Sequence, residues 1–477
     1  MNKTLRNIFV IIISIFFVSN VFSQNIDAGI NAAQKGDYVK AVNILKNLVK
    51  SEDNYDGYYY YGLALLNTGS IKEAEANLSK ALSKDNEGVG ALMTMGNLYS
   101  KKREFDKADT YFKRALKVEP ENVDVLLAQA KNYTVAGKID EAITVLTFAK
   151  TITKEDPKVY VGLGTAYYYR RAFKPAVDNY NSALKLQSSN AEAHFGLGQV
   201  YFREKKYNDA LAEYKKSVQA NPNFADAYLE MGRLLYFNEN YDDALTAFDK
   251  YGKLQPGSIE GETYRAKVKY GQKKYDEALQ ILDEVVKNNP DADLSSAYKY
   301  LAYVYNDKQE YQKALDDFNK VPKNLYDTED YIKLAQIYLN LNNIDKAYES
   351  FNEAMISDST NDEIFYQIGV AQFNQKNYAK AIVNFDKSIA LGSRQIAAYV
   401  YKGLCFYSLQ AYEDAINVFN TVNNIDNSYF QSWLWKARSE EALNKIDDAK
   451  ASFKRALEID PGNKSAQDDL NRLEQKQ

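Results

Sequence analysis

The stretch 191–224, AEAHFGLGQVYFREKKYNDALAEYKKSVQANPNF, decides the fold of this 477-residue chain. Leu197 and Tyr201 lie four residues apart before a polar segment, and Ala210 and Tyr214 lie four apart after it. Because residues three and four apart share one face of a helix, the stretch predicts two amphipathic helices joined by a turn. The proline near its end stops the second helix, since proline cannot donate the backbone hydrogen bond that a helix interior needs.

The same pattern recurs along the whole chain, anchored by an alanine that follows an aromatic residue or isoleucine by three positions. Most successive anchors are 34 residues apart, and a gap of 36 before Ala314 is the largest departure. A repeat of this length is typical of helical solenoids, in which each unit buries its apolar face against its neighbours. The thirteen anchors are Ala41, Ala74, Ala108, Ala142, Ala176, Ala210, Ala244, Ala278, Ala314, Ala347, Ala381, Ala415 and Ala449.

This pattern closely resembles the tetratricopeptide repeat, a helix–turn–helix unit of about 34 residues. The resemblance covers about residues 25–463 and implies an all-α fold. The expected architecture is a right-handed α-solenoid (superhelix) of about thirteen repeats with a C-terminal capping helix. With the anchor as position 20, small residues at positions 8 and 20 would let the paired helices approach closely. Unit 6 has the family's signature residues at His194, Leu197, Gly198, Tyr201, Tyr207, Ala210, Tyr214 and Pro222.

Two irregular places suggest how the array is divided. Two extra residues near 291–294 produce the long gap, and Pro322 falls where the second helix of unit 9 should continue. A proline inside a helix costs about 3 kcal/mol, so we expect this helix to stop early and the stack to bend or loosen there. The predicted parts are a signal peptide at 1–23, units 1–8 at 24–290, units 9–13 at 291–463 after an irregular joint at 291–328, and a polar-backed capping helix at 464–477.

The first 23 residues resemble a secretory signal peptide. Lys3 and Arg6 precede an apolar run over 8–18, and Val21 and Ser23 fit the positions that a signal peptidase reads. An uncleaved membrane anchor is the alternative, but the run is shorter than the roughly 20 residues that a spanning helix needs. No Cys lies near the cleavage point, so no lipoprotein anchor is expected. The predicted location is the periplasm or cell envelope.

The composition argues against catalysis, metal binding and nucleic-acid binding. The chain has one Cys and one His, and its formal net charge is −4, so it lacks a disulfide framework, a multi-histidine cluster and a basic excess. His194 occupies position 4, which holds aromatic residues in other units, and Cys405 follows a close-packed glycine. We therefore expect packing roles for both residues, and no enzyme activity, catalytic residue, metal site or cofactor.

The resemblance implies that positions 2, 5, 9, 12 and 13 of each first helix line a concave face. In units 5–8 these positions carry aromatic side chains with polar neighbours, which suits an extended peptide or an amphipathic helix. The idealised repeat itself favours Tyr at positions 5 and 12, so generic surface is the alternative. Ser100 and Thr134 interrupt the aromatic run in units 2–4, which places the predicted centre in units 5–8. The predicted partner-binding residues are Tyr168, Tyr169, Phe195, Gln199, Phe202, Arg203, Arg233, Tyr236, Phe237, Lys267 and Tyr270.

One subgroup of the family binds peptides that end in a carboxylate through a clamp of Lys, Asn and Arg. Asn97 stands at position 9 of unit 3, where one clamp Asn would be, but Met93 replaces the Lys at position 5. The later units lack the paired Lys and Arg. A clamp of that type, with its chaperone partners, is not expected.

The function predicted from these observations is a non-enzymatic scaffold or adaptor of the bacterial cell envelope, which binds partner peptides or helices on the concave face. The expected partners are other proteins, within an envelope complex, with no nucleic acid and no membrane span after signal cleavage. A carbohydrate-binding adaptor in polysaccharide or peptidoglycan assembly is the alternative, because aromatic faces also stack on sugars.

Overall fold

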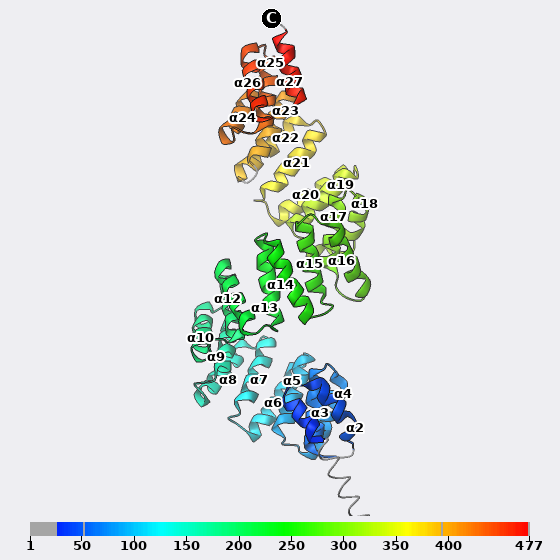
Figure 1. Ribbon diagram of the computed structural model, residues 1–477, viewed down its shortest axis with the longest axis vertical. Helices are drawn as coiled ribbons and strands as arrows, with labels where there is room; N and C mark the ends of the chain where they lie inside the picture. Colours follow the sequence, from blue (N-terminus) through cyan, green and yellow to red (C-terminus); the bar gives the residue numbers. More distant parts are fainter. Residues whose placement is uncertain (1–25, 51–52, 393–394, 476–477) are drawn as a thin grey trace, which may run out of the picture. The chain divides into compact units, whose positions relative to one another are not determined.

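The computed structural model describes residues 26–50, 53–392 and 395–475, and all regular elements in these ranges are helical (Figure 1). The predicted signal peptide, 1–23, lies outside the described residues. The first helices of the repeats are α3 (Tyr55–Asn67), α5 (Val89–Lys101), α7 (Val123–Val135), α9 (Pro157–Tyr169), α11 (Ala191–Arg203), α13 (Ala225–Phe237), α15 (Ile259–Gly271), α17 (Ser295–Asp307), α19 (Thr328–Asn340), α21 (Asp362–Asn374), α23 (Gln395–Ser408) and α25 (Phe430–Ala442).

Each second helix follows the first helix of its repeat after a turn of three residues. None of the helices in the described part of the chain is both long and apolar enough to cross a bilayer. The second helices are α2 (Tyr38–Leu48), α4 (Ile71–Lys84), α6 (Phe105–Val118), α8 (Ile139–Ile152), α10 (Phe173–Leu186), α12 (Tyr207–Ala220), α14 (Tyr241–Leu254), α16 (Tyr275–Asn288), α18 (Tyr311–Phe318), α20 (Ile344–Ser357), α22 (Tyr378–Leu391), α24 (Tyr412–Ile425) and α26 (Ile446–Ile459), with η1 (Lys323–Leu325) after α18 and α27 (Lys464–Glu474) at the end.

The chain divides into two compact units, Met1–Gln255 and Pro256–Gln477. Within each unit, every second helix packs against the first helix of its own repeat and against the first helix of the next (Figure 1). This arrangement confirms the predicted all-α solenoid of helix–turn–helix repeats. The division falls after Gln255, whereas the irregular joint predicted at 291–328 lies inside the second unit.

Pairs of small and large residues bring the helices together. Tyr180 of α10 is almost fully buried between Gly164 of its own repeat and Gly196 of the next. A Cβ atom would lie 2.6 Å from the Tyr180 ring at Gly164 and 2.2 Å from it at Gly196. Both distances are shorter than van der Waals contact, so the ring occupies the space that the two glycines leave. The close approach predicted for position 8 is therefore present.

The turn inside each repeat has a left-handed residue at position 15. Its φ is near +60° in most repeats, a conformation that costs L-residues about 1–2 kcal/mol and that glycine adopts freely. Glycine stands there only at Gly36, Gly69 and Gly137 among the described repeats. The other turns use Arg103, Arg171, Lys205, Glu239, Lys273, Gln309, Asn342, Lys376, Gln410 and Asn444.

The second helix of unit 9 is much shorter than its counterparts. α18 has 8 residues where most second helices have 14, and it ends four residues before Pro322. This early end agrees with the break expected from the proline. The chain that follows is fastened to the stack, because Tyr326 donates a hydrogen bond to the Phe318 carbonyl over 2.6 Å and Val321 is buried.

The last helix, α27, buries Ala466, Leu470 and Leu473 against α25 and α26. Its remaining side chains are mostly polar, so it covers the apolar face of the final repeat with a hydrophilic outer surface.

Candidate partner-binding grooves

The predicted partner-binding residues lie on four first helices that belong to two different units. α9 carries Tyr168 and Tyr169, and α15 of the second unit carries Lys267 and Tyr270. The remaining predicted residues are Phe195, Gln199, Phe202 and Arg203 on α11 and Arg233, Tyr236 and Phe237 on α13.

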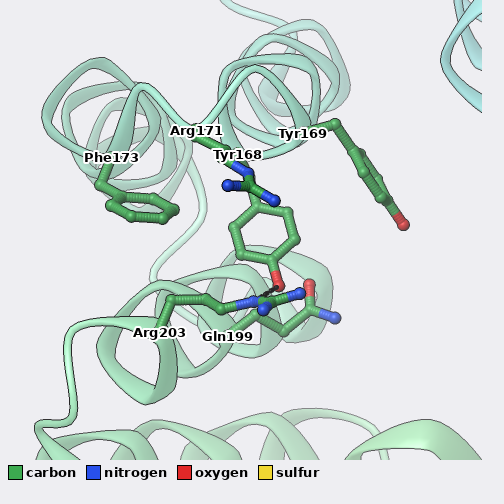
Figure 2. Close-up of a pocket in the computed structure, with 6 residues that line it drawn as sticks. All are labelled: Tyr168, Tyr169, Arg171, Phe173, Gln199 and Arg203. Atoms are coloured by element: carbon green, nitrogen blue, oxygen red, sulfur yellow. Dashed lines mark hydrogen bonds between the residues drawn. The ribbon is translucent and has the colours of Figure 1, made fainter. Parts of the chain in front are cut away.

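Four of the predicted residues come together in one pocket of about 540 Å³ between α9 and α11. Figure 2 shows the Tyr168 ring pointing from α9 toward Gln199 and Arg203 on α11, while the Tyr169 ring points away from it. Arg203 donates its Nε–H to the Tyr168 hydroxyl over 3.2 Å. Tyr169 is 58% exposed and its ring lies 5.4 Å from that of Tyr168, centroid to centroid.

Two further residues complete this pocket, and sequence reasoning missed both. Arg171 is the left-handed turn residue at position 15, and Phe173 begins α10 with its ring 6.3 Å from Tyr168. Among the described residues, the lining holds two guanidinium groups and no carboxylate. The hydrogen bond with Tyr168 raises the pKa of Arg203, so this group stays charged. We call the six lining residues, Tyr168, Tyr169, Arg171, Phe173, Gln199 and Arg203, the arginine pocket.

The other predicted residues of the first unit mainly contact their own neighbours. Phe195 packs against Tyr214 and Phe224, with ring centroids 5.6 and 5.0 Å away, and Phe202 contacts Tyr207. On α13, Arg233 pairs with Glu230 at 3.0 Å, and Tyr236 packs on Phe237 and Tyr241. Phe237 remains 63% exposed and offers an apolar surface at the end of α13.

In the second unit, Lys267 and Tyr270 are engaged in a cluster of tyrosines. The Lys267 ammonium lies 4.4 Å from the ring centre of Tyr264 and 4.7 Å from that of Tyr300. Tyr270 donates its hydroxyl proton to Asp307 over 2.9 Å. Burial, and then the nearby Asp307 carboxylate, raise the pKa of Tyr270, so the hydroxyl stays protonated as a donor. Both side chains thus have internal partners.

A second groove, of about 840 Å³, lies where the sequence had suggested an interruption. It runs over α3, α5 and α7, and Lys101, Arg103 and Lys131 are its charged residues. Aromatic content pointed away from these repeats, and the lysines at positions 9 and 13 were the only hint of it in the sequence. We call this the lysine groove; its further lining residues are Tyr38, Leu63, Leu66, Asn67, Thr94, Asn97, Ser100, Leu127, Ala128 and Val135.

The reactive side chains singled out by the sequence are packed between helices. His194 is nearly buried, with Nδ1 2.6 Å from Glu213 Oε2 and Nε2 3.2 Å from the Ser188 carbonyl. Burial raises the pKa of the Cys405 thiol to about 12, which keeps it protonated and unreactive. Within the described ranges, no three His, Cys, Asp or Glu side chains are grouped so that they could hold a metal ion.

Comparison with known families finds tetratricopeptide repeats in several parts of the chain. Models described as "Tetratricopeptide repeat" match residues 201–268, then 26–88 and 265–324, and then 331–359. A model of the tetratricopeptide repeat protein 21 C-terminal ARM domain matches 60–231, and one of subunit 3 of the anaphase-promoting complex, or cyclosome, matches 374–456.

The curated relatives match over short stretches. Heat shock protein STI1 of Saccharomyces cerevisiae is 32% identical over 114 residues, which are 24% of this chain and 19% of STI1. Peptidyl-prolyl cis-trans isomerase FKBP4 of Mus musculus is 22% identical over 147 residues, 28% of this chain and 32% of the isomerase. The chain thus spans only about a fifth to a third of the length of these relatives.

Among solved structures, matches include the Cut9–Hcn1 hetero-tetramer of the anaphase-promoting complex, with a TM-score of 0.49, 15% identity, and 93% and 94% of the two chains covered. PilF of Pseudomonas aeruginosa has a TM-score of 0.35 and 24% identity over 45% of this chain and 97% of its own. The matches to family models, together with the helix pairs described above, establish that the chain contains tetratricopeptide repeats.

Proposed function

We propose that this protein is a non-enzymatic scaffold that binds segments of partner proteins on the first helices of its repeats. The arginine pocket is the observation that carries the proposal. It combines exposed aromatic surface at Tyr169 with guanidinium donors at Arg171 and Arg203. Tyr and Arg side chains are enriched among the residues that dominate binding energy at protein interfaces.

The pocket suits a partner segment that places an apolar side chain on the rings and a hydrogen-bond acceptor near the guanidinium groups. The hydrogen bond from Arg203 holds Tyr168 between α9 and α11, so part of the surface is ordered before a partner arrives. Ordering of this kind lowers the entropy lost on binding.

The proposed setting is the bacterial cell envelope, after export and removal of residues 1–23. The charged start and the short apolar run of this segment support that location. N-terminal sequencing of protein recovered from the envelope is the direct test. A chain that begins at Gln24 is the expected result, and an intact Met1 on exported protein would refute cleavage.

Site-specific photo-crosslinking in cells tests the scaffold proposal. A benzoyl-phenylalanine in place of Tyr169 should give discrete protein adducts that mass spectrometry identifies. The matched control is the same group in place of Phe148, an exposed aromatic residue of α8 outside both grooves. Adducts at 169 that are absent at 148 and lost in R171A/R203A support the scaffold, and equal adducts at the two positions refute this site.

The same aromatic surface keeps the carbohydrate alternative testable, because tyrosine rings also stack on sugars. A glycan array probed with wild type and Y169A separates the two functions. Glycan binding that needs Tyr169, without protein adducts at 169, would replace the scaffold proposal by a carbohydrate-binding adaptor.

A further inference from the structure

The lysine groove differs from the arginine pocket in both its charge and its apolar surface. Its floor is aliphatic, formed by Leu63 and Leu66 of α3 and by Leu127 and Val135 of α7. Val135 is 53% exposed, so apolar area is available to a partner. Tyr38 is the one aromatic residue of the lining. This floor suits aliphatic side chains.

The positive charges of the groove form no ion pair with any described residue. They belong to Lys101, Arg103 and Lys131, whose side chains are exposed. The neighbouring Lys102, which lies outside the groove, instead pairs with Glu75 at 3.2 Å and with Glu104 at 2.9 Å.

Among the described residues no carboxylate lines the groove, although the chain as a whole carries a formal charge of −4. Three cations on a concave surface without counter-charges create a local positive potential. That potential favours an anionic partner and speeds its approach, because complementary charges steer diffusional encounter.

The size of the groove limits the ligand to a short segment. Its lining comes mainly from three consecutive first helices, α3, α5 and α7, with Arg103 in the turn after α5 and Tyr38 at the start of α2. Packed helices lie about 8–10 Å apart, so the groove spans on the order of 20 Å. An extended chain rises about 3.3 Å per residue, so roughly six residues cover this length.

We propose that the lysine groove binds an acidic, aliphatic segment of a partner protein in extended conformation. Its Asp and Glu side chains face Lys101, Arg103 and Lys131, and its Leu, Ile or Val side chains lie on the floor formed by Leu63, Leu66 and Leu127. The carboxylates belong to side chains inside the segment, so a free C-terminus is not required. The inference rests on the proposed scaffold function but uses none of the residues of the arginine pocket.

Selection of random heptapeptides displayed on phage, on protein comprising residues 24–477, tests this proposal. The expected result is enrichment of sequences that combine Asp or Glu with Leu, Ile or Val. An enriched peptide, amidated at its C-terminus, is then titrated by calorimetry against wild type and variants. We expect K101E/K131E to bind at least ~10-fold more weakly, and added salt to weaken wild-type binding.

The matched control is K72E/K117E, which makes the same change in net charge at exposed lysines of α4 and α6 outside the groove. It should bind like wild type. The proposal is overturned if no selected peptide depends on Lys101 and Lys131, if both double variants lose binding equally, or if binding needs a free C-terminal carboxylate. Since the crosslinking test of the scaffold probes Tyr169, either proposal can fail without the other.

Discussion

Tyr303 of α17 donates its phenolic proton to Oδ1 of Asp330 on α19 over 2.8 Å, and both side chains are buried. Lys299, also on α17, pairs with the other carboxylate oxygen. That same oxygen accepts the backbone N–H of Asp327, which caps α19. The buried Asp330 carboxylate thus links the start of α19 to α17. α17 belongs to the repeat with the shortened helix α18, and α19 begins the next repeat.

Removing this carboxylate should destabilise the second unit. In Asp330→Ala the Tyr303 hydroxyl loses its acceptor. Lys299 keeps the Leu325 carbonyl and, at 4.0 Å, the Asp327 carboxylate, so the loss should be about 3 kcal/mol, at the low end for a broken buried pair. Tyr303→Phe removes one hydrogen bond and should cost about 1–2 kcal/mol. Urea unfolding followed by circular dichroism measures both losses. Asp345→Ala, at an exposed residue of α20, is the control and should change little; equal losses in D345A and D330A would contradict the role of Asp330.

Glycine at a left-handed turn should stabilise the array. Lys205 has φ near +60°, so Lys205→Gly relieves backbone strain and should add up to about 1 kcal/mol, less the entropy that glycine gains in the unfolded chain. Gly137→Lys, at the same position of another repeat, should lose a similar amount. Thermal unfolding shows whether each substitution raises or lowers the stability of the protein. Lys215→Gly in the middle of α12 should instead destabilise by about 1 kcal/mol, and stabilisation by K215G would refute the turn-specific explanation.

Acid should weaken one contact between repeats. The hydrogen bond from Tyr99 of α5, aided by Lys102, lowers the pKa of Glu75 on α4. A carboxyl group with a lowered pKa stabilises the fold above its unfolded pKa, about 4.3 for Glu, and loses that contribution as the pH falls through the folded value.

Tyr99→Phe removes the donor, so its Tm should lie below that of wild type at pH 7, and the difference should shrink toward pH 3. Melting curves at both pH values measure this change. A difference in Tm that stays constant with pH would show that Glu75 does not mediate the effect.

A side chain at Gly196 should be costly because of the ring beside it. A Cβ there would lie 2.2 Å from Tyr180, so Gly196→Ala forces the two repeats apart and should cost about 1–3 kcal/mol. In a Tyr180→Leu background the same substitution should cost less, since the ring edge is gone. The double-mutant cycle, measured by urea unfolding, gives the coupling between the residues. If the stability losses of the two single variants simply add up in the double variant, the Cβ at position 196 does not clash with the Tyr180 ring.

That residues 291–328 form a weak point of the array remains a prediction. Limited trypsin digestion should cut first after Lys320 or Lys323, which are exposed beside Pro322. Mass spectrometry of the earliest fragments identifies the site. A first cut elsewhere would contradict the prediction, and the contacts of Tyr326 and Lys299 with this segment would explain it.

The sequence predicts the repeats well because packing in this fold is local. The 34-residue spacing places Gly164 and Tyr180 on facing helices. Because one residue is small and the other large, their close packing can be predicted from the sequence. The division after Gln255 was not predicted, because the spacing of the repeats stays regular there.

The candidate site was predicted less completely. The aromatic residues at the concave positions led to the prediction of Tyr168 and Tyr169, which line the arginine pocket. The position of a residue in the repeat does not tell whether its ring is available to a partner, because Phe195 and Tyr270 also stand at concave positions and pack against other rings of the protein. The lysine groove was missed because its signal is the absence of carboxylates near Lys101 and Lys131. That absence becomes visible only when three helices are placed side by side.

The packing of Tyr180 between Gly164 and Gly196 bears on how the number of repeats in this protein can change. Repeats in tandem are prone to duplication and loss by unequal recombination, and a frame of 34 residues preserves the helices through such events. The equivalent ring of the next repeat, Tyr214, is just as buried and lies near Glu230, which stands at position 6 of the repeat that follows it. Excising residues 191–224 would keep the frame and bring Tyr180 before Glu230, the neighbour that Tyr214 has now, so a repeat can be lost here without creating a new kind of contact.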